Sequence, residues 1–532
     1  PVAPARVPRW ALPLLAALAL AGVGLAGWRL AGRQALPRIT IGRAEAIARA
    51  QAALAGRGVV LPAGWRWHAE VLAPDGEAVD FAWRAGGREA VQALIGTHLP
   101  APRWVVRAAT WRGPVADRAE EWYVAVGGDG TVRRVRHVLP EARPGAALDE
   151  PAARAAAWRA LAPLGITEGR WVAVTVEPTR HPARTDWDVT VRDTVATGLP
   201  GGERRARVRL AGDEVADVER FLFVPEAWRR EEEREATAVQ LLGVALAIIT
   251  FSLVGVALVR GVVAWGRGAL APGRHMVAAL VVGGTSTLAA LNGVPALPAR
   301  FVTSQPFTLQ AATAAAAGTV GIVLGAGALL VLLTWALRAL ATQPRTRLPP
   351  WWGVLAACAL LASRQVGDLT RLGRTPGFGG WGALDAAVPF LEPLLSALAA
   401  LGTTVLPPLA ALALAALALP RGPWRGAAPI LALGFASGAT VGLEPTTDWL
   451  VSGAAGVLCW LAVWATTLRV DPTLLPLISA VQVAYRALAT AVLDRVPGAL
   501  PAGLVAAVGV LALGGLAVRW LRGRLDAEVA AA

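Results

Sequence analysis

Hydrophobic positions divide the chain into an apolar part and a polar part. The first apolar run covers 10–28, has a tryptophan at each end and is flanked by arginines. Runs of this length suit membrane-spanning helices, so the pattern predicts about ten spans. The later runs lie at 236–259, 276–297, 309–337, 351–363 (expected to extend past Arg364), 385–419, 427–443, 449–468, 473–493 and 499–518.

The first run is predicted to be an uncleaved signal anchor within residues 1–35. It follows arginines, and no clear A-x-A cleavage site comes after it. Tryptophans at both ends of a span match the aromatic belts found at membrane interfaces.

Residues 36–235 are richer in charge, contain no run of spanning length and show signs of an internal repeat. A helix is predicted over 40–58 and a second over 147–166, with Asp149 as N-cap and Gly165 as C-cap. Alternating strand patterns with glycine turns follow at 122–142 and 208–227. Two helix-plus-strands units in one α+β domain are therefore expected. The charge-rich segment 223–236 is predicted to be a helical stalk that leads into the next span.

Arginine positions predict the orientation in the membrane. Loops rich in arginine follow the runs that end near 259, 337, 419, 468 and 518, and such loops favour the cytoplasmic side. The expected fold is a polytopic all-α membrane bundle, 236–532, with an α+β extracytoplasmic domain inserted after the first span. Both termini are expected in the cytoplasm. The arginines at 364, 371 and 374 do not fit this alternation.

Composition supports a membrane protein. The chain of 532 residues is 55% hydrophobic, with a mean hydropathy of +0.50. Its net charge of +14 comes from arginine, because the sequence contains no lysine. This charge is explained by the arginine-rich loops, so no nucleic-acid partner is expected. The Arg-, Ala- and Gly-rich usage is typical of a GC-rich bacterial genome and suggests the bacterial inner membrane. Cys358 and Cys459 both lie in apolar runs and predict no disulfide framework.

Groups for catalysis are scarce in the membrane half. It contains one histidine, His275, and a zinc site needs three or four clustered ligands. No sequence motif for a metalloprotease, a serine hydrolase or a P-loop occurs. Asp385 and Glu392 are seven residues apart and fall on one helix face. No metal and no cofactor are expected.

Two family resemblances accompany these patterns. The segment YVAVGGDGTV at 123–132 resembles the hairpin of PepSY-type domains, which are extracytoplasmic and are thought to bind or inhibit peptidases. A generic α+β domain is the alternative. The order of anchor, external domain, stalk and multi-span bundle resembles large bacterial members of the CPBP family of CAAX proteases and bacteriocin-processing enzymes. That resemblance implies an intramembrane endopeptidase in which a glutamate activates water and histidines assist.

The catalytic motifs of that family, E-E-x-x-x-R, F-x-x-x-H and a final histidine, are not intact here. Alignment by eye places Thr403 and Thr404 at the two glutamates and Pro408 at the arginine. Ser437 takes the place of the first histidine and Ala480 that of the last. A threonine hydroxyl does not ionise near neutral pH and cannot replace glutamate as a general base.

The sequence thus favours a catalytically degenerate CPBP-like protein that contacts membrane lipid and binds an unknown membrane protein or peptide. One alternative is an active intramembrane endopeptidase with a shifted site based on Glu392. Another is a transporter in which the proline-containing segment 385–419 lines the substrate path. Helix packing by small residues is the simplest role for the threonines and Ser437.

Overall fold

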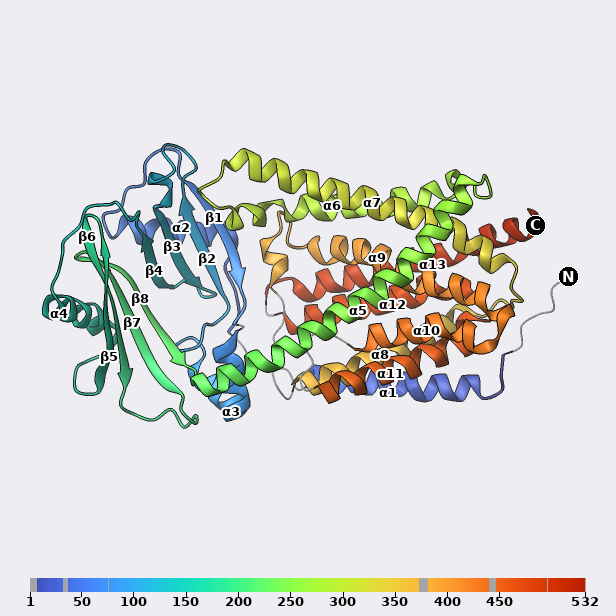
Figure 1. The fold of residues 1–532 in the computed structure, drawn as a ribbon, viewed down its shortest axis with the longest axis horizontal. Coiled ribbons are helices and arrows are strands. Elements are labelled where there is room, and N and C mark those ends of the chain that lie inside the picture. The colour runs from blue at the N-terminus through green and yellow to red at the C-terminus, as the bar shows by residue number, and fades with distance from the viewer. Residues whose placement is uncertain are drawn as a thin grey trace.

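The structure, a computed structural model, describes residues 7–31, 37–74, 76–372, 381–439, 446–494 and 496–531. Within these residues, ten long helices form a bundle, and eight strands form a sheet domain (residues 37–224) at one end of it (Figure 1). Successive bundle helices run in alternating directions. They are α1 (Ala11–Ala31), α5 (Glu226–Gly266), α6 (Met276–Gly293), α7 (Phe307–Ala341), α8 (Pro350–Leu372), α9 (Glu392–Ala418), α10 (Pro423–Gly438), α11 (Thr446–Val463), α12 (Leu475–Leu493) and α13 (Ala499–Ala531).

Eight of the described helices are long and apolar enough to cross a membrane, as expected of a multi-pass integral membrane protein. The other two predicted spans, α8 and α10, are shorter or more polar than these eight helices. Helix α10 has only 16 residues, and the second half of α8 carries charged residues. The predicted extension of this segment past Arg364 is confirmed, because α8 continues to Leu372.

The proline-containing segment 385–419 is interrupted near its first proline, Pro389, but is continuous across its later pair of prolines. Helix α9 starts only at Glu392 and then continues through Pro407 and Pro408 to Ala418. A proline lacks the N–H that would bond four residues back, so the carbonyls of Thr403 and Thr404 lose those helical donors. The actual interruption lies before the helix, where a 3-10 turn (Gly382–Asp385) leads into α9.

The sheet domain consists of two units, each with a helix and a four-stranded antiparallel sheet, as the repeat predicted. The strands follow chain order in both sheets. Asp149 caps the helix of the second unit by accepting from the Ala152 N–H at 2.9 Å. Gly165, with φ 71°, closes the 3-10 turn (Ala162–Leu164) that directly follows this helix. The elements are α2 (Arg43–Ala55), β1 (Arg66–Leu72), β2 (Arg103–Ala109), β3 (Glu121–Gly127) and β4 (Val132–Val138), then α4 (Glu150–Leu161), β5 (Trp171–His181), β6 (Arg184–Asp193), β7 (Glu203–Ala211) and β8 (Glu214–Phe223).

One helix of the sheet domain was not predicted. Helix α3 (Glu77–Leu94) lies between β1 and β2 and contains Gly86 and Gly87, which obscure its helical pattern. It anchors the start of α5, since Arg84 forms two bonds of 2.6 and 2.9 Å with Glu232. The predicted helical stalk is confirmed, and α5 crosses the expected boundary at 235/236 without interruption.

The core of the first unit includes side chains from the bundle. Trp381 is 3% exposed and belongs to the same cluster as Trp104 and Val124 of the sheet. Leu384 and Val496, which flank α9 and α13, pack against this cluster. The two parts of the molecule therefore share a hydrophobic core.

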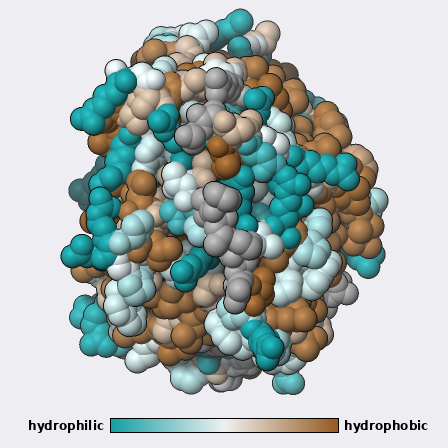
Figure 2. All heavy atoms as spheres, turned by 90° about the vertical axis from the view of Figure 1, so that its right-hand side faces the viewer, coloured by the Kyte–Doolittle hydropathy of each residue, from teal (hydrophilic) through white to brown (hydrophobic). Residues whose placement is uncertain are grey.

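The opposite end of the bundle, here called the distal end, collects the arginine-rich loops. Figure 2 looks onto this end, where hydrophilic side chains lie across the face. Arg522 pairs with the buried Asp471 at 2.9 Å, and Arg345 pairs with Asp526 at 3.0 Å. Their location at one end agrees with the predicted alternation of loops.

Candidate functional site

A buried ion pair attaches the first sheet to the loop between α6 and α7. Arg107 on β2 and Glu121 on β3 are 7% and 8% exposed, and the guanidinium binds both carboxylate oxygens at 2.9 and 2.6 Å. Arg107 also donates to the Phe301 carbonyl at 2.6 Å, and the Thr303 hydroxyl donates to Glu121 at 3.1 Å. Both charges are thus paired and hydrogen-bonded, as burial requires.

A second contact attaches the edge of the same sheet to the turn before α9. The Val71 N–H on β1 donates to Asp385 at 2.9 Å, and Arg43 on α2 donates to the Asp385 backbone carbonyl. Burial raises the pKa of the Asp385 carboxyl, which Val71 and Arg43 partly oppose. Asp385 therefore accepts a hydrogen bond from an N–H on the edge strand β1, which has no neighbouring strand on that side.

Asn292, at the end of α6, joins this turn to the start of α9. Its carbonyl accepts from the Ala387 N–H at 2.7 Å, and its side-chain oxygen accepts from the Val388 N–H at 2.8 Å. Its amide nitrogen donates to Glu392 at 2.9 Å. Since Asn292 is only 6% exposed, these bonds hold Glu392 in one orientation.

Glu392 lines a large cavity, which we call the junction cavity. It has a volume of about 590 Å³ and lies between the start of α9, the end of α12 and the turn into α13. A further space of about 480 Å³, lined by Arg38, Thr40 and Asp494, lies beside it and reaches the sheet domain. The junction cavity thus lies where the sheet domain meets the bundle.

Two polar rows line the junction cavity. Glu392 and Ser396 lie one turn apart on α9, Arg486 and Thr490 lie one turn apart on α12, and Asp494 is the residue directly after α12. The Ser396 hydroxyl bonds the Glu392 carboxylate. The remaining lining is mostly alanine, proline and other apolar residues. Such a site, apolar with a few convergent polar groups, suits ligand binding.

The contacts of Glu392 bear on whether these residues could hydrolyse a peptide bond. A general base needs a partner that orients it or activates water, and Glu392 is bonded to an amide and a hydroxyl. No histidine is among the described residues that line the cavity. His275 is instead buried near the distal end, against Thr334 and Trp520. Within the described part of the chain, no cluster of side chains could hold a metal ion.

The residues that the CPBP resemblance singles out do not line either large cavity of the bundle. Thr403 and Ser437 donate to carbonyls of their own helices, at 3.1 Å in each case. Pro408 is buried, and Ala480 packs with Leu401 in an apolar cluster. Thr404 is half-buried on α9. Glu392 alone, among the candidates derived from the sequence, faces a cavity.

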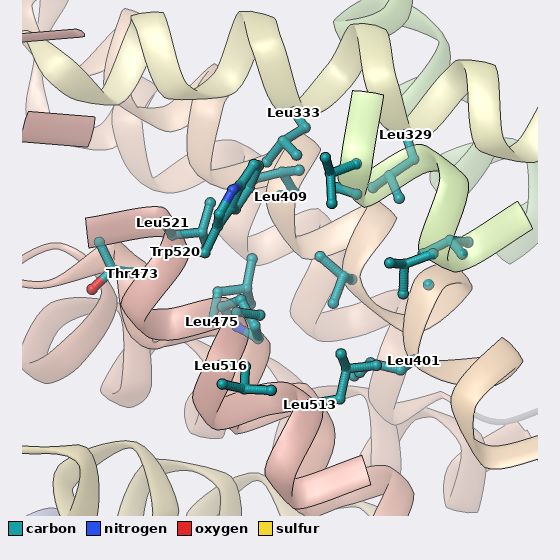
Figure 3. Close-up of a pocket in the computed structure, with 18 of the residues that line it drawn as sticks. Leu329, Leu333, Leu401, Leu409, Thr473, Leu475, Leu513, Leu516, Trp520 and Leu521 are labelled. Carbon is teal, nitrogen blue, oxygen red and sulfur yellow. The ribbon is translucent and has the colours of Figure 1, made fainter. Parts of the chain in front are cut away.

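The second cavity, here the bundle cavity, has a different character. It has a volume of about 280 Å³ between α6, α7, α9, α12 and α13, and leucine and valine side chains dominate its lining (Figure 3). Its hydroxyls are already bonded, Thr285 to the Val281 carbonyl and Thr473 to Asp471. It therefore offers a hydrocarbon surface without reactive groups.

In comparisons with known proteins, no family model matches the chain, and no curated protein or solved structure matches it. The site must be interpreted from its own residues.

Sequence reasoning found Glu392 but missed Asn292, Arg486 and Thr490. The spacing of Arg486, Thr490 and Asp494, four residues apart each time, was the available signal for a polar row on one helix face. Asn292 gave no comparable signal, because its partners lie about a hundred residues away along the chain.

Proposed function

We propose that the protein is an integral membrane binding protein that receives a segment of a membrane peptide in the junction cavity and does not hydrolyse it. The observation that carries this proposal is that two sets of polar residues, one with Glu392 and one with Arg486 and Asp494, line the same cavity among apolar residues. A peptide segment offers both backbone polar groups and apolar side chains to such a lining.

The proposal keeps the resemblance to the CPBP family and treats this chain as a relative that has lost the catalytic groups. A PepSY-like, extracytoplasmic role for the sheet domain is part of it, since the arginine-rich loops gather at the opposite end and favour the cytoplasm. The bacterial inner membrane is the proposed location.

The alternative of an active endopeptidase with a shifted site has one observation in its favour, the position of Glu392 in the junction cavity. Against it, both carboxylate oxygens of Glu392 already accept hydrogen bonds, one from Asn292 and one from Ser396. No histidine is among the described residues that line the cavity with Glu392. The transporter alternative has less support, because the Thr403 and Ser437 side chains bond within their own helices.

The test combines cross-linking with cleavage mapping. A photo-reactive amino acid replaces Ala400, which lines the junction cavity, and as a control replaces Val508, which is 67% exposed on α13. We expect cross-links to a membrane polypeptide from position 400 only, and their loss when Arg486→Gln is added. Polypeptide N-termini in the membrane fraction should be the same in wild type, a deletion strain and Glu392→Gln.

Two results would contradict the proposal. Cleavage sites that disappear both on deletion and in Glu392→Gln would show an active endopeptidase. Equal cross-linking from positions 400 and 508, or cross-links that survive Arg486→Gln, would show that the junction cavity does not select a peptide.

A further inference from the structure

The bundle cavity opens sideways out of the protein. Its floor is buried, with Leu409 4% and Leu475 2% exposed. Its rim is exposed, since Val277 on α6 and Leu516 on α13 are each 60% exposed. Helices α6 and α13 both pack on α7 and α9 but not closely on each other. The opening therefore lies between α6 and α13, on a flank of apolar helices that faces lipid in a membrane.

The length of the bundle cavity is close to the hydrocarbon thickness of one lipid leaflet. Its lining on α13 extends from Leu513 to Leu525, which at about 1.5 Å per residue is roughly 18 Å. The hydrocarbon of one leaflet is roughly 15 Å, half of a core of about 30 Å. Figure 3 shows Leu401 and Leu513 toward one end, and Trp520, Leu521 and Thr473 toward the other. An extended acyl chain fits this span from the distal interface to the bilayer centre.

The distal end of the bundle cavity carries positive charge. The Arg524 guanidinium lies 5.5 Å from the centre of the Trp520 ring, and Trp520 lines the cavity. Tryptophan and arginine at this depth are typical of the membrane interface, and arginine there attracts anionic headgroups. Arg522 is not available for this role, because it bonds Asp471, Thr473 and the Leu348 carbonyl.

We propose that the bundle cavity is a binding site for an anionic phospholipid of the distal leaflet. One acyl chain lies between α6 and α13 against α7 and α9, and the phosphate lies at Arg524. The proposal concerns a different cavity from the junction cavity and does not depend on peptide binding there.

The experiment uses the full chain in nanodiscs and native mass spectrometry after release into mild detergent. The nanodiscs contain phosphatidylglycerol and phosphatidylcholine with the same acyl chains, at equal amounts. We expect retention of one phosphatidylglycerol in preference to phosphatidylcholine. Ala517→Trp, which places an indole in the cavity, should lower retention at least tenfold. Val508→Trp, on the same helix but outside the cavity, should leave it unchanged.

The headgroup is tested separately. Loss of one arginine at an anionic surface costs about 1 kcal/mol, which is about fivefold in affinity. Arg524→Gln should therefore weaken retention of phosphatidylglycerol about fivefold, while the exposed Arg519→Gln changes it little. Leu513→Trp is a second filling variant if Ala517→Trp is not monodisperse. Equal retention of both lipids, or unchanged retention in a monodisperse filled variant, would overturn the proposal.

Discussion

Removal of the carboxylate of Glu121 should loosen the junction between the sheet domain and the bundle. Glu121→Gln keeps the shape of the side chain but leaves the guanidinium of Arg107 buried without a counter-charge. Breaking a buried ion pair by removing one partner costs about 3–5 kcal/mol. Arg107 keeps its bonds to the Ala299 and Phe301 carbonyls, so we expect a value near the lower limit, about 3 kcal/mol.

The assay is thermal unfolding of the purified full chain, with hydrogen exchange to locate the change. For a domain as large as the sheet domain (37–224), 1 kcal/mol shifts the midpoint of thermal unfolding by about 2–4 °C. Glu121→Gln should therefore lower the midpoint for this domain by roughly 6–12 °C. Amides in 294–306 and in β1 should exchange faster. The matched control is Asp129→Asn, which weakens a pair with Arg133 whose side chains are 53% and 56% exposed. Exposed pairs contribute at most about 1 kcal/mol. A Glu121→Gln shift no larger than that of Asp129→Asn would refute the reasoning.

Three further predictions test other parts of the structure. Burial, together with the positive charges of Arg107, Arg66 and Arg43, lowers the pKa of His68 from 6.5 to about 4. Below pH 6.5 the folded state therefore binds fewer protons than the unfolded state, and stability falls as the pH drops from 6.5 toward 4. His68→Phe should reduce the loss of melting temperature between neutral pH and about pH 5. A Cβ on Gly456 would lie 2.2 Å from the Gly434 carbonyl oxygen, whereas one on Gly327 meets nothing within 4 Å. Gly456→Ala should therefore lower the melting temperature by several degrees, and Gly327→Ala should not. Equal effects of the two substitutions would contradict close packing of α10 on α11. Asn292→Ala removes the acceptor of the Val388 N–H and one of the two donors to Glu392, at a cost of about 1–3 kcal/mol. It should accelerate amide exchange in 386–392 while β5 is unchanged.

Local sequence patterns predicted much of the fold. The Asp149 cap, the Gly165 terminus and the glycine hairpins depend on neighbouring residues, and the structure confirms them. The apolar runs predicted the bundle helices because membrane spans have a simple length requirement. Helix α3 was missed since two adjacent glycines lower the helical signal of a short segment. The segment 385–419 is not helical around Pro389, whereas α9 continues through Pro407 and Pro408.

The candidate site was harder to predict because its residues meet only after folding. Glu392 was noticed as a rare acid at the start of an apolar run, and Arg486 lies on a helix nearly a hundred residues further along. Positions chosen by resemblance, such as Thr403, turned out to point elsewhere on the same helix. A helix advances about 100° per residue, so Gly402 lines the bundle cavity while its neighbour Thr403 does not.

The contacts at the junction decide what belongs to the site. Asp385 binds the edge of β1, the backbone two and three residues later binds Asn292, and Asn292 binds Glu392. Each step is a hydrogen bond of at most 2.9 Å. The bundle alone would leave the Asp385 carboxyl without Val71 and Arg43, and Trp381 without its core. The orientation of Glu392 therefore depends on the docked sheet, and the sheet domain is part of the site and not a module tethered beside it.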